Sequence, residues 1–523
     1  MSAHRSGRTP AWTLTLVLVA LFMLVLDMTI VAVALADLQR DFDAGLAELQ
    51  WVVDAYTLPL AGLLLTAATL GDRVGRRRVY ICGLLLFTVG SLACALAGST
   101  LQLDGARALQ GVGGALLLGV GLPLIGAAYP DTAKRAAAVG AYGATLSAAT
   151  AVGPLLGGLL VDGPGWRWIF LVNVPVGVVA LIAAVLRLGD SRSPAPRRAD
   201  WVGTVLLSSG LVTLVLALIR GNEDGWTSPT ILGLFVASAG LLGAFVPWEL
   251  RRPEPMLEFR LFRVPAFSAI GFAALAISAT LIASTSYLAL YLQNTLGHTP
   301  FETGLRFLPL TLASFVASLV GAALYHRVPL RFLLGGSLVL SAEGMLLLAL
   351  MSGDLTWAAL LPGFVIAGIG LGVSSAVISY GSLTCPPDQA GMATATLSTL
   401  RQIGIAAGVA ILGALFTSTT ESTATQRLDG APLPPGTVTD LVHALGSGAG
   451  VRAMADAPEL ARGWLTDLAR DASADGINAL LLVGGALAAL SAVAAFVLIQ
   501  GDRPRPAVTH RTHRRERAYA SSR

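Results

Sequence analysis

Three ionisable residues stand inside long stretches of the sequence that are rich in apolar residues: Asp27, Arg107 and Glu343. If those stretches cross a membrane as helices, a charge at the helix centre costs at least ~2.5 kcal/mol, so each residue is a candidate functional group. At about 1.5 Å per residue, the three side chains would lie ~8 to 12 Å from the same end of their helices. We therefore expect that they could face one cavity.

A carboxylate beside an arginine can bind and release a proton. A neighbouring cation favours the ionised carboxylate, whereas an apolar wall without the cation favours the protonated form. We predict that Asp27 carries a proton and that Arg107 controls its proton affinity; the alternative is a static ion pair that only fixes helix packing. Glu343 could hold a cationic substrate, act as a second proton site or make a structural hydrogen bond. Asp54, at the outer end of its stretch, is predicted to be an interfacial residue.

The composition indicates that the elements carrying these charges are membrane-spanning helices. The 523 residues are 54% hydrophobic and 13% charged, with a mean hydropathy of +0.72, whereas soluble domains carry about 25% charged residues. Apolar runs long enough to cross a ~30 Å hydrocarbon core recur along the chain. A helix satisfies every backbone N–H and C=O within lipid, so we predict an all-α polytopic membrane protein.

The apolar runs predict fourteen spans. They cover residues 12–35, 51–71, 79–98, 102–126, 137–161, 168–187, 201–219, 230–248, 267–292, 304–325, 332–351, 357–380, 399–418 and 477–499. Arginines gather in the loops on the side of the two termini, so the positive-inside rule predicts that both termini are cytoplasmic. Residues 1–11 would be a cytoplasmic N-terminus, and 419–476 a long external loop that could contain short surface helices. The basic segment 500–523 would be a solvated cytoplasmic tail, or would dock on anionic membrane lipid.

Three motifs accompany the charged residues. The segment G-D-R-V-G-R-R-R lies between the second and third spans, where a glycine permits a sharp turn. Gln110, Gly111 and Gly113 follow Arg107 in the fourth span. The segment G-P-L-L-G-G lies in the fifth span, where proline frees a backbone carbonyl and glycines let a neighbouring helix approach closely; plain helix packing is the alternative. The motif residues are Asp72, Arg73, Gly75 and Arg76 in the turn, and Gly153, Pro154, Gly157 and Gly158 in the fifth span.

Together these motifs resemble the major facilitator superfamily, and within it the fourteen-span drug:proton antiporters. Leu26-Asp27-Met28-Thr29 in the first span also matches that family. The resemblance implies a major facilitator fold with two six-helix bundles, residues 12–187 and 267–499, and two extra inserted spans within 201–248. It also implies proton coupling through Asp27 and Arg107, a cytoplasmic gating role for the turn, and an exporter's role for the fifth-span motif.

These observations predict proton-coupled efflux of small hydrophobic or cationic drugs or antibiotics across the cytoplasmic membrane. The driving force would be the proton gradient, without a cofactor or a metal. The alternatives are a proton-coupled transporter of an ordinary metabolite, and a receptor or scaffold on the same fold that transports nothing.

Other classes of protein are excluded by missing motifs. The chain has one lysine, Lys134, and no phosphate-binding G-x-x-x-x-G-K-[ST] segment, so we expect no ATP hydrolysis by that route. It has no H-E-x-x-H and no G-x-S-x-G, which argues against an enzyme. Its basic residues lie in short loops, so the net charge of +4 does not indicate nucleic-acid binding. The three cysteines lack metal-ligand spacing.

Overall fold

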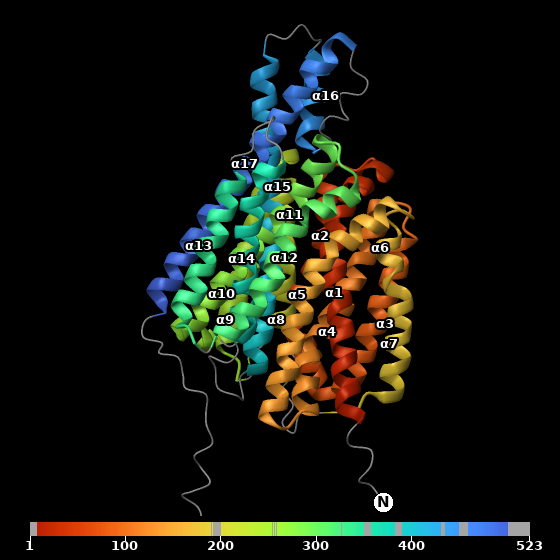
Figure 1. Ribbon diagram of the computed structural model, residues 1–523, viewed down its shortest axis with the longest axis vertical. Coiled ribbons are helices and arrows are strands. Elements are labelled where there is room, and N and C mark those ends of the chain that lie inside the picture. The colour runs from red at the N-terminus through yellow and green to blue at the C-terminus, as the bar shows by residue number, and fades with distance from the viewer. Residues whose placement is uncertain are drawn as a thin grey trace, which may run out of the picture.

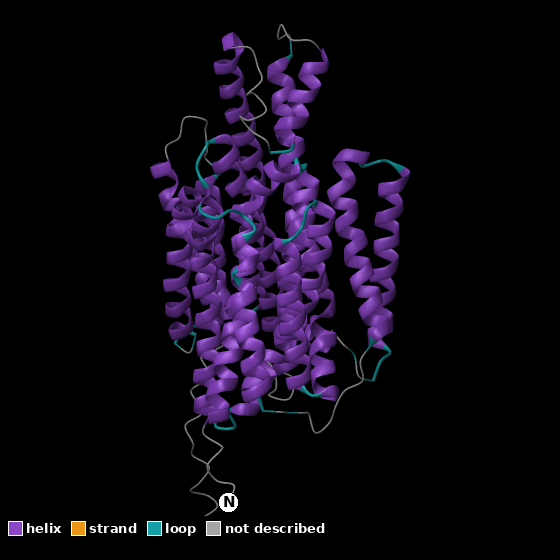
Figure 2. Ribbon diagram, turned by 90° about the vertical axis from the view of Figure 1, so that its right-hand side faces the viewer, coloured by secondary structure: helices purple, strands orange, loops and turns teal. Residues whose placement is uncertain are grey.

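A computed structural model describes residues 8–189, 191, 200–253, 255, 257, 259–325, 327–349, 357–381, 390–429, 435–448 and 459–499. Every regular element over these residues is a helix, as Figure 2 shows. This confirms the predicted all-α class. The predicted N-terminal segment lies mostly, and the basic tail entirely, outside the described residues.

The first half of the chain contains seven helices. They are α1 (Arg8–Phe42), α2 (Leu46–Val74), α3 (Arg76–Ala95), α4 (Thr100–Ala128), α5 (Thr132–Asp162), the short α6 (Trp168–Leu171) and α7 (Asn173–Arg187). The inserted pair is α8 (Trp201–Asp224) and α9 (Pro229–Leu250). Of this pair, α8 packs against α2 and α15, whereas α9 packs against α8.

The second half begins with a short 3₁₀ turn, η1 (Phe259–Arg263). It continues through α10 (Pro265–Ile277), the π-helical turn η2 (Ser278–Ile282), α11 (Ala283–Leu290), the π-helical turn η3 (Tyr291–Thr295), α12 (Pro300–Leu324), α13 (Leu330–Leu348), α14 (Trp357–Tyr380), α15 (Ala390–Leu428), α16 (Pro435–Gly446) and α17 (Glu459–Leu498). Figure 1 shows the helices of the two halves side by side along the long axis of the molecule.

The helices agree with the predicted number of spans. Thirteen described segments are long and apolar enough to cross a membrane, and α2 makes fourteen if its bent parts, Leu46–Leu64 and Thr66–Val74, are one span. Buried backbone polar groups in lipid require such continuous helices. The chain is therefore a multi-pass membrane protein.

The predicted external loop is the main difference from expectation. Within 419–476, α16 is a short helix of the kind expected, but α15 continues through Leu428 and α17 begins at Glu459, so both extend past their predicted spans. Figure 1 shows these extensions and α16 projecting at the end away from the N-terminus. Their apolar faces form a small separate core that stabilises them outside the bundle. Its buried residues include Ala424, Leu428, Leu441, Leu445, Leu465, Leu468, Ala469 and Ala472.

The two halves are joined by hydrogen bonds at the end opposite the termini. The π-helical turn η3 carries two of the donors. Gln293 Nε2 donates to Val33 O at 2.8 Å, and Asn294 Nδ2 donates to Gln39 Oε1 at 2.7 Å. Gln39 Nε2 in turn donates to Ser447 O at 2.9 Å. Because Val33 and Gln39 belong to α1, these contacts close the bundle at this end.

Candidate functional site

Asp27 on α1 and Arg107 on α4 form an ion pair inside the first half of the bundle. Both residues are 1% exposed. Arg107 Nη1 donates to Asp27 Oδ2. The same guanidinium donates from Nε to Val52 O at 3.1 Å and from Nη1 to Gln110 Oε1 at 3.0 Å. The structure thus brings together the two residues that the predicted proton-coupling role requires to be adjacent.

Two amides complete the shell around the Asp27 carboxylate. Gln110 Nε2 donates to Asp27 Oδ1 at 3.2 Å, and Asn173 Nδ2 donates to the same oxygen at 3.0 Å. Gln110 Nε2 also lies 2.7 Å from Ser91 Oγ. Together with Arg107, these neutral donors hold both carboxylate oxygens of Asp27 in place. The sequence analysis did not identify Ser91 as part of this site. Ser91 lies one turn before Cys94 on α3, and both side chains contact Gln110 of α4.

Aromatic rings cover the Arg107 guanidinium. Its central carbon lies 4.3 Å from the centroid of the Tyr56 ring and 5.7 Å from that of Phe170. Both rings are fully buried. A cation over an aromatic face is stabilised by about 0.5–2 kcal/mol, which offsets part of the cost of keeping the guanidinium out of water.

Small residues after Arg107 allow α4 to lie this close to its neighbours. A Cβ atom at Gly111 would overlap the Tyr56 carbonyl oxygen of α2, and one at Gly113 would lie 2.9 Å from Gly83 O of α3. Close approach of backbones through glycine is typical of packing in membranes. The glycines therefore position Arg107 between α2 and α3, within reach of α1.

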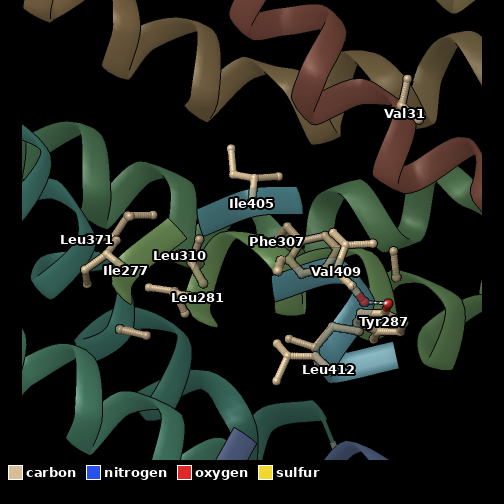
Figure 3. Packing of buried hydrophobic residues seen from close by; sticks show 14 of the residues in the cluster. Val31, Ile277, Leu281, Tyr287, Phe307, Leu310, Leu371, Ile405, Val409 and Leu412 are labelled. Carbon is tan, nitrogen blue, oxygen red and sulfur yellow. Dashed lines mark hydrogen bonds between the residues drawn. The ribbon is translucent and has the colours of Figure 1, made fainter. Parts of the chain in front are cut away.

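A cavity of about 170 Å³ lies between the two halves, next to the ion pair. Arg107 and Tyr56 line it from the first half, and Ile405 and Val409 of α15 line it from the second. Figure 3 shows Ile405 extending toward the first half, where Val31 of α1 lies. Apolar side chains line the cavity together with many hydroxyl groups and two arginines, a combination that suits a small-molecule site.

The expectation that Glu343 shares this cavity is wrong. Glu343 is exposed on α13, on the same face as the exposed Val339, Leu346 and Leu347. The opposite face of α13 packs against α14, where a Cβ atom at Gly344 would overlap Ala367. The apolar surroundings of Glu343 therefore belong to the outer surface of the bundle.

The predicted interfacial position of Asp54 is also wrong. Asp54 is fully buried. The helix α2 packs against α15, and a Cβ atom at Gly413 of α15 would overlap Gln50 Nε2, one turn before Asp54. Thr57 Oγ1 donates to its Oδ1 at 3.3 Å. Within the described part of the chain, Asp54 Oδ2 has no hydrogen-bond partner.

The turn motif holds three helices of the first half together. Arg76 donates to Asp72 Oδ1 from Nη2 at 2.7 Å and from Nε at 3.0 Å, and to Pro123 O of α4 at 3.2 Å. Gly75 has φ 111°, a conformation that favours glycine. Arg73 is exposed. These contacts link the α2–α3 turn to α4.

The fifth-span motif lies where α5 meets α1 and α12. A Cβ atom at Gly157 would lie 2.7 Å from Ile30 Cγ1 of α1, and one at Gly158 would overlap the Pro300 carbonyl oxygen of α12. A Cβ atom at Gly153 would overlap Thr29. Pro154 lies inside α5. This is the close approach that the glycines were expected to allow, and at Gly158 it joins the two halves.

Arg401 is a cavity residue that the sequence did not single out. It lies on α15 and lines the cavity between the halves. The predicted span 399–418 places it at the membrane surface, where an arginine indicates only topology. However, α15 begins at Ala390, so Arg401 lies about three turns inside the helix.

A bundle of membrane-spanning helices in two halves, with a cavity between them, defines a secondary transporter. The chain belongs to the Major Facilitator Superfamily, whose family model matches residues 17–409. The structure resembles a bacterial homologue of the human lysosomal transporter Spinster in an inward-facing, unoccupied conformation, with a TM-score of 0.64 at 17% identity, over 96% of this chain and 100% of that one. The predicted major facilitator fold is confirmed.

Curated relatives carry the names of drug and antibiotic exporters. The chain is 38% identical over 436 residues to the multidrug resistance protein Stp of Mycobacterium tuberculosis, covering 82% of this chain and 80% of that protein. It is 36% identical over 431 residues to a probable actinorhodin transporter of Streptomyces coelicolor, covering 80% and 74% of the two chains. It is 36% identical over 453 residues to the puromycin resistance protein pur8 of Streptomyces alboniger, covering 84% and 88%. These names agree with the predicted resemblance to drug:proton antiporters.

Proposed function

We propose that this chain is a proton-coupled exporter of small, mainly hydrophobic drugs or antibiotics across the cytoplasmic membrane. The observation that carries the proposal is the buried pair of Asp27 and Arg107, of which Arg107 lines the central cavity. The names of the curated relatives support the class of substrate. A charged pair buried within a membrane-spanning bundle is costly and has no evident use in a receptor or scaffold.

The structure suits one state of an antiport cycle. The cavity is closed at the end opposite the termini by the bonds of Gln293 and Asn294 to α1. Its lining continues toward the terminal end through Leu122 of α4 and Thr394 of α15. If both termini are cytoplasmic, as the arginine distribution predicts, this is an inward-facing state in which a substrate enters from the cytoplasm.

In this state Asp27 is paired with Arg107, which is the arrangement expected after proton release. When the transporter faces outward, a proton from outside neutralises Asp27 and removes the attraction between the two side chains. Arg107 then loses its counter-charge and moves toward the polar groups that remain around it. Return to the inward state restores the pair and expels the proton into the cytoplasm, so that each cycle couples proton entry to substrate exit.

Accumulation of fluorescent or radiolabelled compounds in cells that lack their own exporters tests this function. Cells that express the protein should accumulate less of some members of a panel of hydrophobic acids, neutral compounds and cations. A protonophore should abolish the difference, because it removes the gradient. Lower accumulation that survives the protonophore, or equal accumulation of every compound in expressing and control cells, would contradict proton-coupled export.

A further inference from the structure

Two arginines line the cavity, and only one of them has a counter-charge among the described residues. Arg107 is paired with Asp27. Arg401 forms no ion pair with any aspartate or glutamate in the part of the chain that the structure describes. No carboxylate is among the described residues that line the cavity. The described part of the cavity wall therefore has a net positive charge.

The surroundings of Arg401 are polar but neutral. Tyr142, on α5 in the other half of the bundle, lines the same cavity as Arg401. Ser375, Ser379 and Ser398 line it as well; the Ser379 hydroxyl donates to Ser375 O at 2.8 Å, which leaves Ser375 and Ser398 as the hydroxyl donors. Hydroxyls can donate to an anion, and a guanidinium can bind a carboxylate through two parallel hydrogen bonds. The group best suited to this end of the cavity is thus an acidic one.

An apolar wall continues from Arg401 along the same face of α15. Ile405 and Val409 follow at intervals of four residues, and both line the cavity, so the three side chains lie in one row. Val31 of α1 lines the cavity from the other half. The row extends ~12 Å from Arg401 to Val409. It offers a hydrophobic surface to a molecule whose acidic end is held at Arg401.

We propose that the preferred substrates are hydrophobic organic acids, in which a carboxylate or phenolate binds Arg401 and the apolar body lies along Ile405 and Val409. This rests on the proposed export function and narrows its substrate class. It differs from the expectation of hydrophobic or cationic drugs, because a cation would meet the Arg401 guanidinium, which has no counter-charge among the described residues, and no carboxylate in the described lining. An inside-negative membrane potential also assists the exit of an anion.

Binding to the purified full-length protein in lipid nanodiscs tests the proposal, with three probes of the same shape. The probes are anthracene-2-carboxylate, the neutral anthracene-2-carboxamide and the cationic anthracen-2-ylmethylammonium. The wild type should bind the carboxylate at least tenfold more tightly than the other two. Arg401→Gln should abolish this preference while it still binds the amide, which shows that the variant is folded, and Arg401→Lys should keep part of the preference. Arg220→Gln, which removes an exposed arginine of α8 that pairs with Asp224, is the matched control and should behave as the wild type does.

Several outcomes would overturn the inference. They are equal binding of the three probes by the wild type, binding of none of them, and a carboxylate preference that Arg401→Gln leaves unchanged. Since binding is measured without a proton gradient, failure here is separate from failure of the export function. If cells export compounds equally well with Arg401→Gln, only the proposed substrate class is contradicted. If the protein binds the acid through Arg401 but exports nothing, only the proposed export function is contradicted.

Discussion

Arg107 of α4 reaches across the first half of the bundle to Asp27 of α1, and the two residues are each only 1% exposed. Removing one partner of a buried ion pair leaves an uncompensated charge and costs about 3–5 kcal/mol. The pair is therefore both a candidate for proton coupling and a structural element. Tests of its function need variants that keep the charge or the shape of the residue replaced.

Arg107→Lys should separate charge from geometry. Lysine keeps the positive charge but has a single nitrogen, whereas the guanidinium donates from Nε to Val52 and from Nη1 to Asp27 and Gln110. We expect folded protein whose substrate-driven proton release is slowed at least tenfold. Arg107→Gln, which loses the charge, should lower the melting temperature in detergent by several degrees. Wild-type proton release in Arg107→Lys would contradict the role of the guanidinium geometry.

Asn173→Ala should slow proton-coupled transport. Asn173 Nδ2 donates to Asp27 Oδ1 at 3.0 Å, and a hydrogen bond to a charged group contributes about 1.5–3 kcal/mol. Its loss leaves Gln110 as the one amide donor to that oxygen among the described residues, so the carboxylate is held less firmly beside Arg107. We expect substrate-driven proton release in vesicles to fall several-fold while the variant stays folded. Unchanged proton release would indicate a packing role for Asn173.

Gly158→Val should impair export through the contact between the halves. The new Cβ atom would overlap the Pro300 carbonyl oxygen, so α5 and α12 would be forced apart at the closed end. We expect loss of most of the export activity in cells that accumulate normal amounts of the protein. Gly140→Ala is the matched control on α5, because a Cβ atom there meets nothing within 4 Å. Equal activity of the two variants would show that close packing at Gly158 is not required.

Asp200 should stabilise the start of α8 in a pH-dependent way. Burial of its carboxyl opposes ionisation, but hydrogen bonds from the Gly203 amide, the Trp248 indole and Arg252 outweigh burial and lower the pKa of Asp200 below its usual value. A lowered folded-state pKa gives stability that is present above the unfolded pKa of about 3.9 and is lost as pH falls through the folded pKa.

Asp200→Asn should consequently lower the melting temperature at pH 7, and the difference from the wild type should shrink at pH 3. Thermal unfolding of the purified protein in detergent at the two pH values measures this. Asp224→Asn, at the other end of α8 where the carboxylate is paired with Arg220 near the surface, is the control and should have a smaller effect at pH 7. A pH-independent difference for Asp200→Asn would contradict the role of its ionised form.

The sequence predicts the spans and the central ion pair because lipid imposes strong rules. A span must be long and apolar, and a charge within it needs a partner, so Asp27 and Arg107 could be predicted to be adjacent. The sequence does not predict in the same way which face of a helix a side chain occupies. Where a helix is apolar all around, as α13 is, periodicity does not distinguish lipid from protein, and Glu343 was placed on the wrong face.

The extent of a helix beyond its apolar core is equally hidden in the sequence. The segment after the thirteenth span is polar, so nothing in its composition shows that α15 continues to Leu428 and packs against α16 and α17. At the other end of α15, the apolar run begins close to Arg401, so the sequence predicts that this arginine lies at the membrane surface. The helix in fact begins at Ala390. How far α15 extends at each end depends on its packing against other helices, and the local sequence pattern does not predict that packing.

The most direct test of proton coupling is substrate-induced proton release in energised everted vesicles, with the wild type compared with Asp27→Asn. Asparagine keeps the shape of the side chain and can still accept a hydrogen bond from Arg107, but it cannot carry a proton. The vesicles are challenged with hydrophobic acids, neutral compounds and cations while the pH gradient is followed. We predict that some compounds dissipate the gradient in the wild type and that none does so in Asp27→Asn. An undiminished response in Asp27→Asn would contradict the assignment of Asp27 as the proton carrier.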